Sequence, residues 1–140
     1  MSFKSKHDKL KQIFSSCNSP EDCYKKIIQL GNALLPLDPS FKTEANRVQE
    51  CQSALYLHTL YENEVMIFTA EADALISKGL AALLIAVYNH EAPVTIIKHP
   101  PTYLIEIGIP QSLSPSRSNG LSSLFLRMQQ EAIKYFSRSN

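Results

Sequence analysis

The sequence predicts an α+β domain in which a small antiparallel β-sheet packs against helices. Two patterns indicate this class: alternation of period two at the centre of the chain, which resumes after a short polar turn, and helical periodicity on both sides of it. A chain of 140 residues suffices for one hydrophobic core, so we expect a single domain over residues 1–140. With 44% hydrophobic and 19% charged residues, the composition is that of an ordinary globular protein.

Two helices are expected before the sheet. The first spans about 4–16, and the second begins at Pro20, because Ser19 before it is a good N-cap and proline suits the first helical position. Pro36 ends the second helix, and residues 36–44 form a connector. Four lysines of the first helix form either a docking patch for an acidic partner or only a solvated face: Lys4, Lys6, Lys9 and Lys11.

The sheet is predicted from the alternation that starts at Arg47. One strand continues to Leu60 and a second covers 65–70, with Glu62-Asn63 as the turn between them. A third, short strand at about 46–49 could join them.

Residues 71–89 carry the strongest helical pattern, which predicts a largely buried helix across the sheet. Gly79 in its middle costs roughly 1 kcal/mol relative to alanine, so we expect another element to pack closely there. Lys78 is the one charge in this apolar run, and it extends either to solvent or towards the loop that precedes the first strand.

The remaining chain is expected to be mostly helical. Short helices are predicted at about 92–100 and 103–109. Residues 114–120 read as a polar turn whose serines can cap the next helix, and a closing amphipathic helix follows as far as about Phe136.

Charge and apolar runs exclude several classes of protein. The net charge is +1 with both signs mixed along the chain, which argues against a nucleic-acid or anionic-membrane surface. The most apolar run, 80–88, is too short to span a bilayer, and the amino terminus has no apolar run typical of a secretory signal. Three cysteines do not suggest a disulfide framework, so we expect a reducing, cytoplasmic setting.

Motifs for most enzyme classes are missing from the sequence. There is no glycine-rich phosphate loop, no HExxH and no paired-cysteine metal motif, so neither a metal nor a cofactor is expected. Cys17 and Cys23 match no zinc spacing and are interpreted as packing residues. His58 is interpreted as a half-buried, hydrogen-bonded histidine.

Cys51 stands between a polar run and the first predicted strand. It is either a small buried hydrophobic residue or a thiol on a loop that performs exchange chemistry. The local pattern alone leaves both interpretations open, but no other residue offers a candidate site.

Four segments of the sequence together match the motifs of one known family: Asn46 with Val48–Ser53 and Tyr56, then Asp73–Leu80, then Leu113–Leu121, and more weakly Leu30-Gly31 before Leu35-Pro36. On these segments the chain resembles the SufE family of sulfur-acceptor proteins. The resemblance implies the α+β fold that this family shares with the U-type iron–sulfur scaffold proteins.

The resemblance also implies a role in iron–sulfur cluster assembly. Family members take sulfur from the persulfide of a pyridoxal-phosphate-dependent cysteine desulfurase (SufS-like), stimulate that enzyme, and pass the sulfur to a scaffold (SufB-like). Carried over to this chain, Cys51 is the acceptor, and the protein is an accessory to the desulfurase and not a free-standing enzyme. Attack of a thiolate on a persulfide parallels thiol–disulfide exchange and needs no cofactor.

Two positions depart from the family pattern. Glu50 stands where the family usually has glycine before the acceptor cysteine, and a neighbouring carboxylate opposes thiolate formation. Tyr56 replaces the usual tryptophan and keeps an aromatic ring. We hypothesise that cations within the matched motifs offset Glu50 and favour the thiolate; they are Arg47, Lys78 and Arg117. The alternative is that Arg117 and Asp73 are only structural, capping or pairing across elements.

Two other functions compete with the carrier. A regulatory partner would activate a desulfurase allosterically without accepting sulfur. A cluster scaffold would need several converging thiolate or imidazole ligands, and only Cys51 occupies a motif of that kind.

Overall fold

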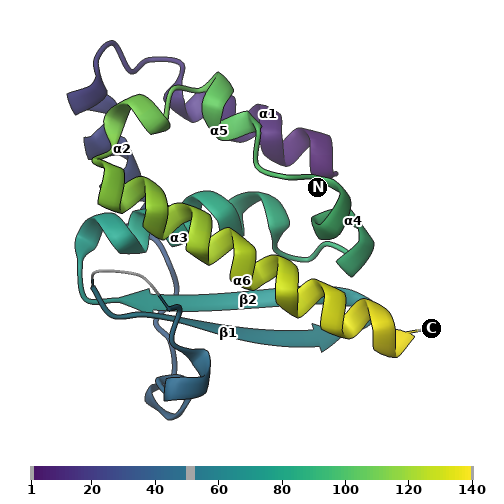
Figure 1. The fold of residues 1–140 in the computed structure, drawn as a ribbon. Coiled ribbons are helices and arrows are strands. Elements are labelled where there is room, and N and C mark those ends of the chain that lie inside the picture. Colours follow the sequence, from purple (N-terminus) through teal and green to yellow (C-terminus); the bar gives the residue numbers. More distant parts are fainter. Residues whose placement is uncertain (1, 50–52, 140) are drawn as a thin grey trace.

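The computed structural model describes residues 2–49 and 53–139 and has the predicted α+β class. Within these residues, one antiparallel sheet of two strands is formed by β1 (Leu55–Glu62) and β2 (Val65–Ala72). The helices gather over one face of this hairpin (Figure 1). They are α1 (Phe3–Phe14), α2 (Pro20–Asn32), α3 (Leu75–Tyr88), α4 (Pro93–Lys98), α5 (Tyr103–Glu106) and α6 (Pro115–Ser139). Three short 3₁₀ turns complete the elements: η1 (Pro39–Phe41), η2 (Glu44–Asn46) and η3 (Pro110–Ser112).

The hairpin pairs residue by residue from Leu55 opposite Ala72 to Glu62 opposite Val65. The turn is therefore Asn63–Glu64, one residue later than the Glu62-Asn63 predicted from sequence. Both turn residues lie in the left-handed region, with φ of 52° and 68°, as a two-residue turn that matches the twist of the strands requires.

The predicted third strand at 46–49 is reduced to a single contact with the edge of the sheet. Arg47 forms an isolated antiparallel bridge with Tyr56, and the Val48 N–H donates to the Leu55 carbonyl at 2.8 Å. Asn46 instead closes the 3₁₀ turn η2, whose N-cap Thr43 accepts a hydrogen bond from the Asn46 N–H.

Helix α3 lies in the core, as predicted, but begins four residues later than expected. The prediction was wrong at its start because Glu71 and Ala72 still pair with β1. Most of α3 is buried, and its contact with α2 depends on two glycines. A Cβ on Gly79 would lie 2.4 Å from the Ile27 carbonyl oxygen, and one on Gly31 would lie 2.5 Å from the Gly79 nitrogen. The close packing predicted at Gly79 is confirmed.

The amino-terminal helices follow the prediction, including the Ser19 cap, whose side chain accepts the Asp22 N–H. The lysines of α1 divide into two groups. Lys6 pairs with Glu91 at 2.5 Å, and its side chain is only 12% exposed, while Lys11 pairs with Glu106 at 2.7 Å. The other two members of the set remain exposed: Lys4 and Lys9. A continuous basic docking patch on α1 is therefore not formed.

Helix α6 begins at Pro115, so the polar turn predicted at 114–120 is wrong in its extent, while the predicted serine cap is confirmed. The Ser114 hydroxyl accepts the Arg117 N–H at 3.3 Å and caps the helix, and proline occupies the first helical position. Buried residues along one side of α6 complete the core: Leu121, Leu124, Met128 and Ala132.

The connector after α2 lies against part of the other face of the hairpin, near one end (Figure 1). The Phe41 ring stacks on the His58 ring with centroids 3.6 Å apart, and Lys42 forms an ion pair with Glu71. This irregular segment therefore covers part of the hairpin face opposite the helices, while Leu60 on β1 stays exposed.

Candidate functional site

The predicted acceptor Cys51 and its neighbour Glu50 lie outside the described residues. The described chain on either side of them is held together at several points. Arg47 and Val48 contact β1 through the bridge and the hydrogen bond described above. On the other side, the Ala54 carbonyl accepts the Asp73 N–H at 3.1 Å. The rigid edge of the hairpin thus fixes both the entry to the acceptor segment and the exit from it.

A polar cluster of Ser53, Ser77 and Arg117 lies next to the acceptor segment. The Ser53 and Ser77 hydroxyl oxygens are 2.8 Å apart and share a hydrogen bond. One guanidinium nitrogen of Arg117 donates to Ser77 at 3.1 Å and to Ser53 at 3.4 Å. Ser77 is only 5% exposed, so the cluster reaches from the surface into the core. Ser53 is two residues from Cys51 in the chain. Among the described residues, this cluster is therefore the hydrogen-bonded polar group that lies closest in sequence after the acceptor.

The cluster joins the amino-terminal turns of two long helices. Ser77 is the third residue of α3 and Arg117 is the third residue of α6, and both helices begin at the same end of the molecule (Figure 1). Helix amino termini carry partial positive charge, and α3 follows Ala74, which makes no side-chain cap hydrogen bond. Two helix termini and one guanidinium therefore place positive charge close to Ser53, and positive charge beside a cysteine favours the thiolate over the thiol.

The three cations proposed to offset Glu50 lie in different surroundings. Arg117 reaches Ser53, as described. Lys78 acts on Glu71: hydrogen bonding from Lys42 lowers the pKa of the Glu71 carboxyl, and the charge of Lys78 adds a smaller decrease. The Arg47 main chain is fixed by the sheet edge. In the part of the chain that the structure describes, Arg117 is the member of the three with a side-chain hydrogen bond to a residue beside the acceptor segment.

Cys17 and Cys23 pack against the core as predicted. Cys23 is 5% exposed, and burial raises the pKa of its thiol, which disfavours the reactive thiolate. Cys17 is half-buried at the edge of the same core. The interpretation of His58 is confirmed only in part. The ring is half-buried, but its Nε2 has no hydrogen-bond partner among the described residues.

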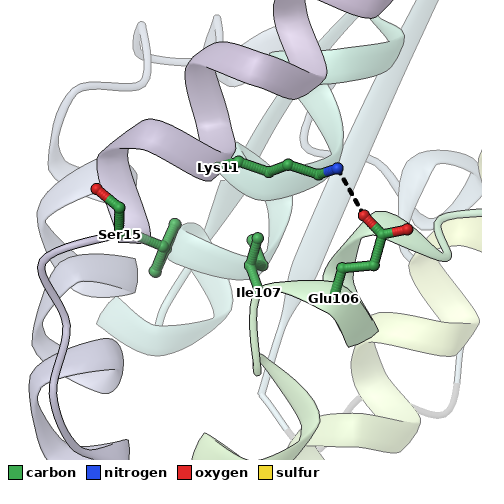
Figure 2. A pocket seen from close by; sticks show the side chains of 5 residues that line it. Lys11, Ser15, Glu106 and Ile107 are labelled. Atoms are coloured by element: carbon green, nitrogen blue, oxygen red, sulfur yellow. Dashed lines mark ion pairs between the residues drawn. The ribbon is translucent and has the colours of Figure 1, made fainter.

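The pocket in Figure 2 is separate from this site. It has a volume of about 380 Å³ and is lined by the ends of α1 and α5 and by the residues that follow them, Ser15 and Ile107. Its two charged residues, Lys11 and Glu106, are paired with each other at 2.7 Å. Each of them holds the other in its charged form, since their hydrogen bond raises the pKa of Lys11 and lowers that of Glu106. We therefore interpret this pocket as a structural crevice between helices.

Within residues 2–49 and 53–139 the structure contains neither a cluster of metal ligands nor a membrane-spanning helix. No three histidine, cysteine or acidic side chains in those ranges gather closely enough to hold a metal ion. No helix there has the length and apolar character needed to cross a bilayer.

Sequence reasoning missed two residues that contribute to the site. Ser77 was part of a matched motif, but its contact with Ser53 depends on how α3 meets the hairpin. Arg127 gave no signal at all, although its guanidinium donates to the Ala45 and Arg47 carbonyls just before the acceptor segment. A polar residue inside an apolar helical run was the available signal for Ser77, whereas nothing in the sequence relates Arg127 to the loop.

Comparisons with known proteins match most of the chain to one family. Residues 8–132 match the family model described as SufE, Fe-S metabolism associated domain. Uncharacterised SufE-like proteins of Synechocystis sp. and Rhizobium etli are 33% and 35% identical, over 91% and 93% of this chain and 80% and 91% of their own lengths.

Two further comparisons concern a longer relative and a solved structure. The chloroplastic/mitochondrial SufE-like protein 1 of Arabidopsis thaliana is 34% identical over 87% of this chain, which spans only 33% of that protein. A solution structure of a hypothetical protein from Thermus thermophilus has a TM-score of 0.77 at 23% identity, covers 94% of this chain and 96% of its own, and shows that the fold is shared. The family match over most of its length and these relatives show that the chain belongs to the SufE family.

Proposed function

We propose that this protein is a sulfur carrier and that its Cys51 accepts persulfide sulfur from a SufS-like cysteine desulfurase. The protein also stimulates that enzyme and passes the sulfur to a SufB-like scaffold. Membership of a family associated with iron–sulfur metabolism supports the general role. The observation that carries the specific proposal is the cluster beside the acceptor segment, where Arg117 and the amino-terminal turns of α3 and α6 meet at Ser53.

The proposed step is a transfer of one neutral sulfur atom. The Cys51 thiolate attacks the outer sulfur of the desulfurase persulfide, so a new S–S bond forms on Cys51. The S–S bond within the desulfurase breaks, and its cysteine leaves as a thiolate. Cys51–S⁻ and enzyme–S–SH thus give Cys51–S–SH and enzyme–S⁻, with no net oxidation and no added cofactor.

The chain supports this step by favouring the thiolate and by holding the acceptor segment on a rigid base. Glu50 opposes ionisation of the adjacent thiol, while the fixed charge of Arg117 and the two helix termini favour it. A reducing setting, which we propose to be the cytoplasm, would keep Cys51 available as a thiol.

The test is to mix the protein with a cysteine desulfurase and cysteine, and to search each cysteine peptide for an added, reductant-labile sulfur. We expect the adduct on Cys51 and its loss, together with loss of desulfurase stimulation, in Cys51→Ser. Cys17→Ser is the matched control, because it removes a half-buried thiol elsewhere and should change neither result.

Full stimulation by Cys51→Ser would contradict the carrier and favour the allosteric activator. Absence of any sulfur on Cys51 in the unaltered protein would contradict it as well.

A further inference from the structure

We infer that Arg127 is a positioning residue for sulfur transfer, because it fixes the chain that enters the Cys51 segment. This inference rests on the proposed function for its consequence in transfer. The structural part, restraint of the entry chain by Arg127, stands on contacts within the described residues.

All three guanidinium nitrogens of Arg127 donate hydrogen bonds. One terminal nitrogen donates to the Arg47 carbonyl at 3.2 Å, and the other donates to the Ala45 carbonyl. The Nε–H donates to the Glu131 carboxylate at 3.4 Å, one helical turn further along α6. The side chains of Arg127 and Glu131 are only 21% and 17% exposed, so solvent screens this group less than an ordinary surface pair. The planar fork of arginine is suited to hold two carbonyls at once.

The two carbonyls belong to the last turn before the acceptor segment. Arg47 pairs with Tyr56, and the next residue, Val48, donates its N–H to Leu55. This edge is a single bridge and not a full strand, so few main-chain hydrogen bonds hold it. Two additional hydrogen bonds from Arg127 therefore make up a large share of the restraint on this stretch.

Helix α6 consequently holds the chain on both sides of Cys51. Arg117 binds Ser53 after the acceptor, and Arg127 binds Ala45 and Arg47 before it. The two arginines are ten residues apart on one helix, which corresponds to about 15 Å along its axis. A single rigid element thus sets the separation of the two described stretches on either side of Cys51, so a docking partner meets these stretches already in place.

A shallow cavity of about 250 Å³ lies beside this contact. Its lining combines the entry chain with α6: Val48, Gln49, Ser123, Leu126, Arg127 and Gln130. The exposed Leu126 side chain and the entry chain thus share one surface whose shape depends on Arg127.

The test compares Arg127→Ala with Lys134→Ala. Lys134 is a matched control because it lies on the same helix and pairs with the same Glu131, at 3.9 Å, and this ion pair does not involve the entry chain. The first readout is amide hydrogen exchange by NMR. We expect Arg127→Ala to accelerate exchange of the Val48 amide about tenfold, the loss of about 1.4 kcal/mol of local protection. The Met66 amide, which donates to Glu91 on the opposite edge of the hairpin, should be unchanged.

The second readout is desulfurase stimulation as a function of the concentration of this protein. Arg127→Ala should raise the half-saturating concentration about 3–10-fold while leaving the maximal rate unchanged, since the entry chain at Ala45 and Arg47 would then have to be fixed when the partner docks. Arg127→Lys should recover little of the lost restraint, because one ammonium does not reproduce the planar fork. Lys134→Ala should match the unaltered protein in both readouts.

Unchanged exchange at Val48 in Arg127→Ala would overturn the inference. Equal acceleration at Val48 and Met66 would also overturn it, since Arg127 would then be a general stabiliser. If Arg127→Ala and Lys134→Ala had the same half-saturating concentration, Arg127 would have no role in sulfur transfer. Failure of the proposed function is a different result, namely that the unaltered protein gains no sulfur on Cys51.

Discussion

The side chain of Arg117 combines a structural and an electrostatic role at one position. Its guanidinium donates to Ser53 and Ser77, which fixes the exit from the acceptor segment. The same group carries a permanent positive charge, because arginine does not deprotonate in proteins. Glu50, which replaces the usual family glycine, brings a negative charge next to the acceptor thiol. We expect the balance between these opposing charges to set the reactivity of Cys51.

Replacing Arg117 by alanine should make Cys51 a weaker nucleophile at neutral pH. Loss of the positive charge disfavours the thiolate, so the midpoint of its alkylation rate against pH should rise by about 0.5–1 unit, equivalent to about 1 kcal/mol. The rate is followed on the Cys51 peptide by mass spectrometry, which separates it from Cys17 and Cys23.

Arg47→Ala and Lys78→Ala serve as comparisons for this prediction. Both should shift the midpoint less, because among the described residues Arg117 is the one of the three whose side chain is hydrogen-bonded to Ser53, and Lys78 acts on Glu71. If none of the three variants altered the profile, cations would not control the acceptor.

At the scale of elements, the contact between α2 and α3 determines where the core helix can lie. Gly31 and Gly79 face each other across the two helices, and each leaves no room for a Cβ. Apart from Cγ2 of Ile27, the obstructing atoms are main-chain atoms of the other helix, which cannot move without displacing it. Displacement of α3 would also move Ser77, so this contact supports the cluster at Ser53.

Gly79→Ala should therefore destabilise the protein, even though alanine is the better helix former. Overpacking of a core typically costs about 1–3 kcal/mol, whereas the gain in helix propensity is about 1 kcal/mol. We expect a net decrease in the free energy of unfolding, measured by urea titration.

The matched control for this prediction is Gln29→Ala on the exposed side of α2. It should change the free energy of unfolding by no more than about 0.5 kcal/mol. A Gly79→Ala protein as stable as this control would show that the helices separate easily.

Local signals predicted most of these elements, and long-range pairing explains the errors. The Ser19 cap, the period-two run and the apolar stripe of 75–88 are visible in the sequence, and each forms the expected element. The start of α3 was misplaced because Glu71 belongs to β2 through its pairing with Tyr56, a contact fixed by register. The serine-rich stretch before Gly120 resembled a turn, yet Ser114 and Pro115 start a helix there.

The candidate site was predictable in its residues but not in its connections. Resemblance to a family indicated Cys51 and Arg117, whereas the role of Arg127 depends on α6 lying beside Ala45 and Arg47. No local pattern encodes that contact. The single-domain organisation over residues 1–140 stays a prediction.

For the whole molecule, two buried tyrosines join the helices into one core. The Tyr88 hydroxyl donates to the His99 carbonyl at 2.6 Å, and the Tyr103 hydroxyl donates to the Leu83 carbonyl at 3.1 Å. Burial raises the pKa of both hydroxyls above the ordinary value for tyrosine. The folded state thus favours the neutral form, and these groups link its stability to pH.

Stability should fall as the pH rises above about 10, where unfolded tyrosine begins to ionise. Below that pH both states hold the proton and the full stability is present. Above it the unfolded state loses the proton first, at a cost in folding free energy of up to about 1.4 kcal/mol per pH unit for each group. Urea titrations between pH 8 and 11 measure this slope.

Tyr88→Phe tests the assignment of the slope. It removes one of the two groups, so the decline with pH should become shallower, whereas Tyr24→Phe at the exposed side of α2 should leave it unchanged. Identical slopes for the unaltered protein and both variants would show that other groups govern alkaline unfolding.

The most direct test of the central claim is the mass of the Cys51 peptide after the protein has been incubated with a cysteine desulfurase and cysteine. We predict an added sulfur of about 32 Da on Cys51 that reductant removes and that Cys51→Ser abolishes. A Cys51 peptide of unaltered mass, with the desulfurase still stimulated, would contradict the sulfur-carrier function.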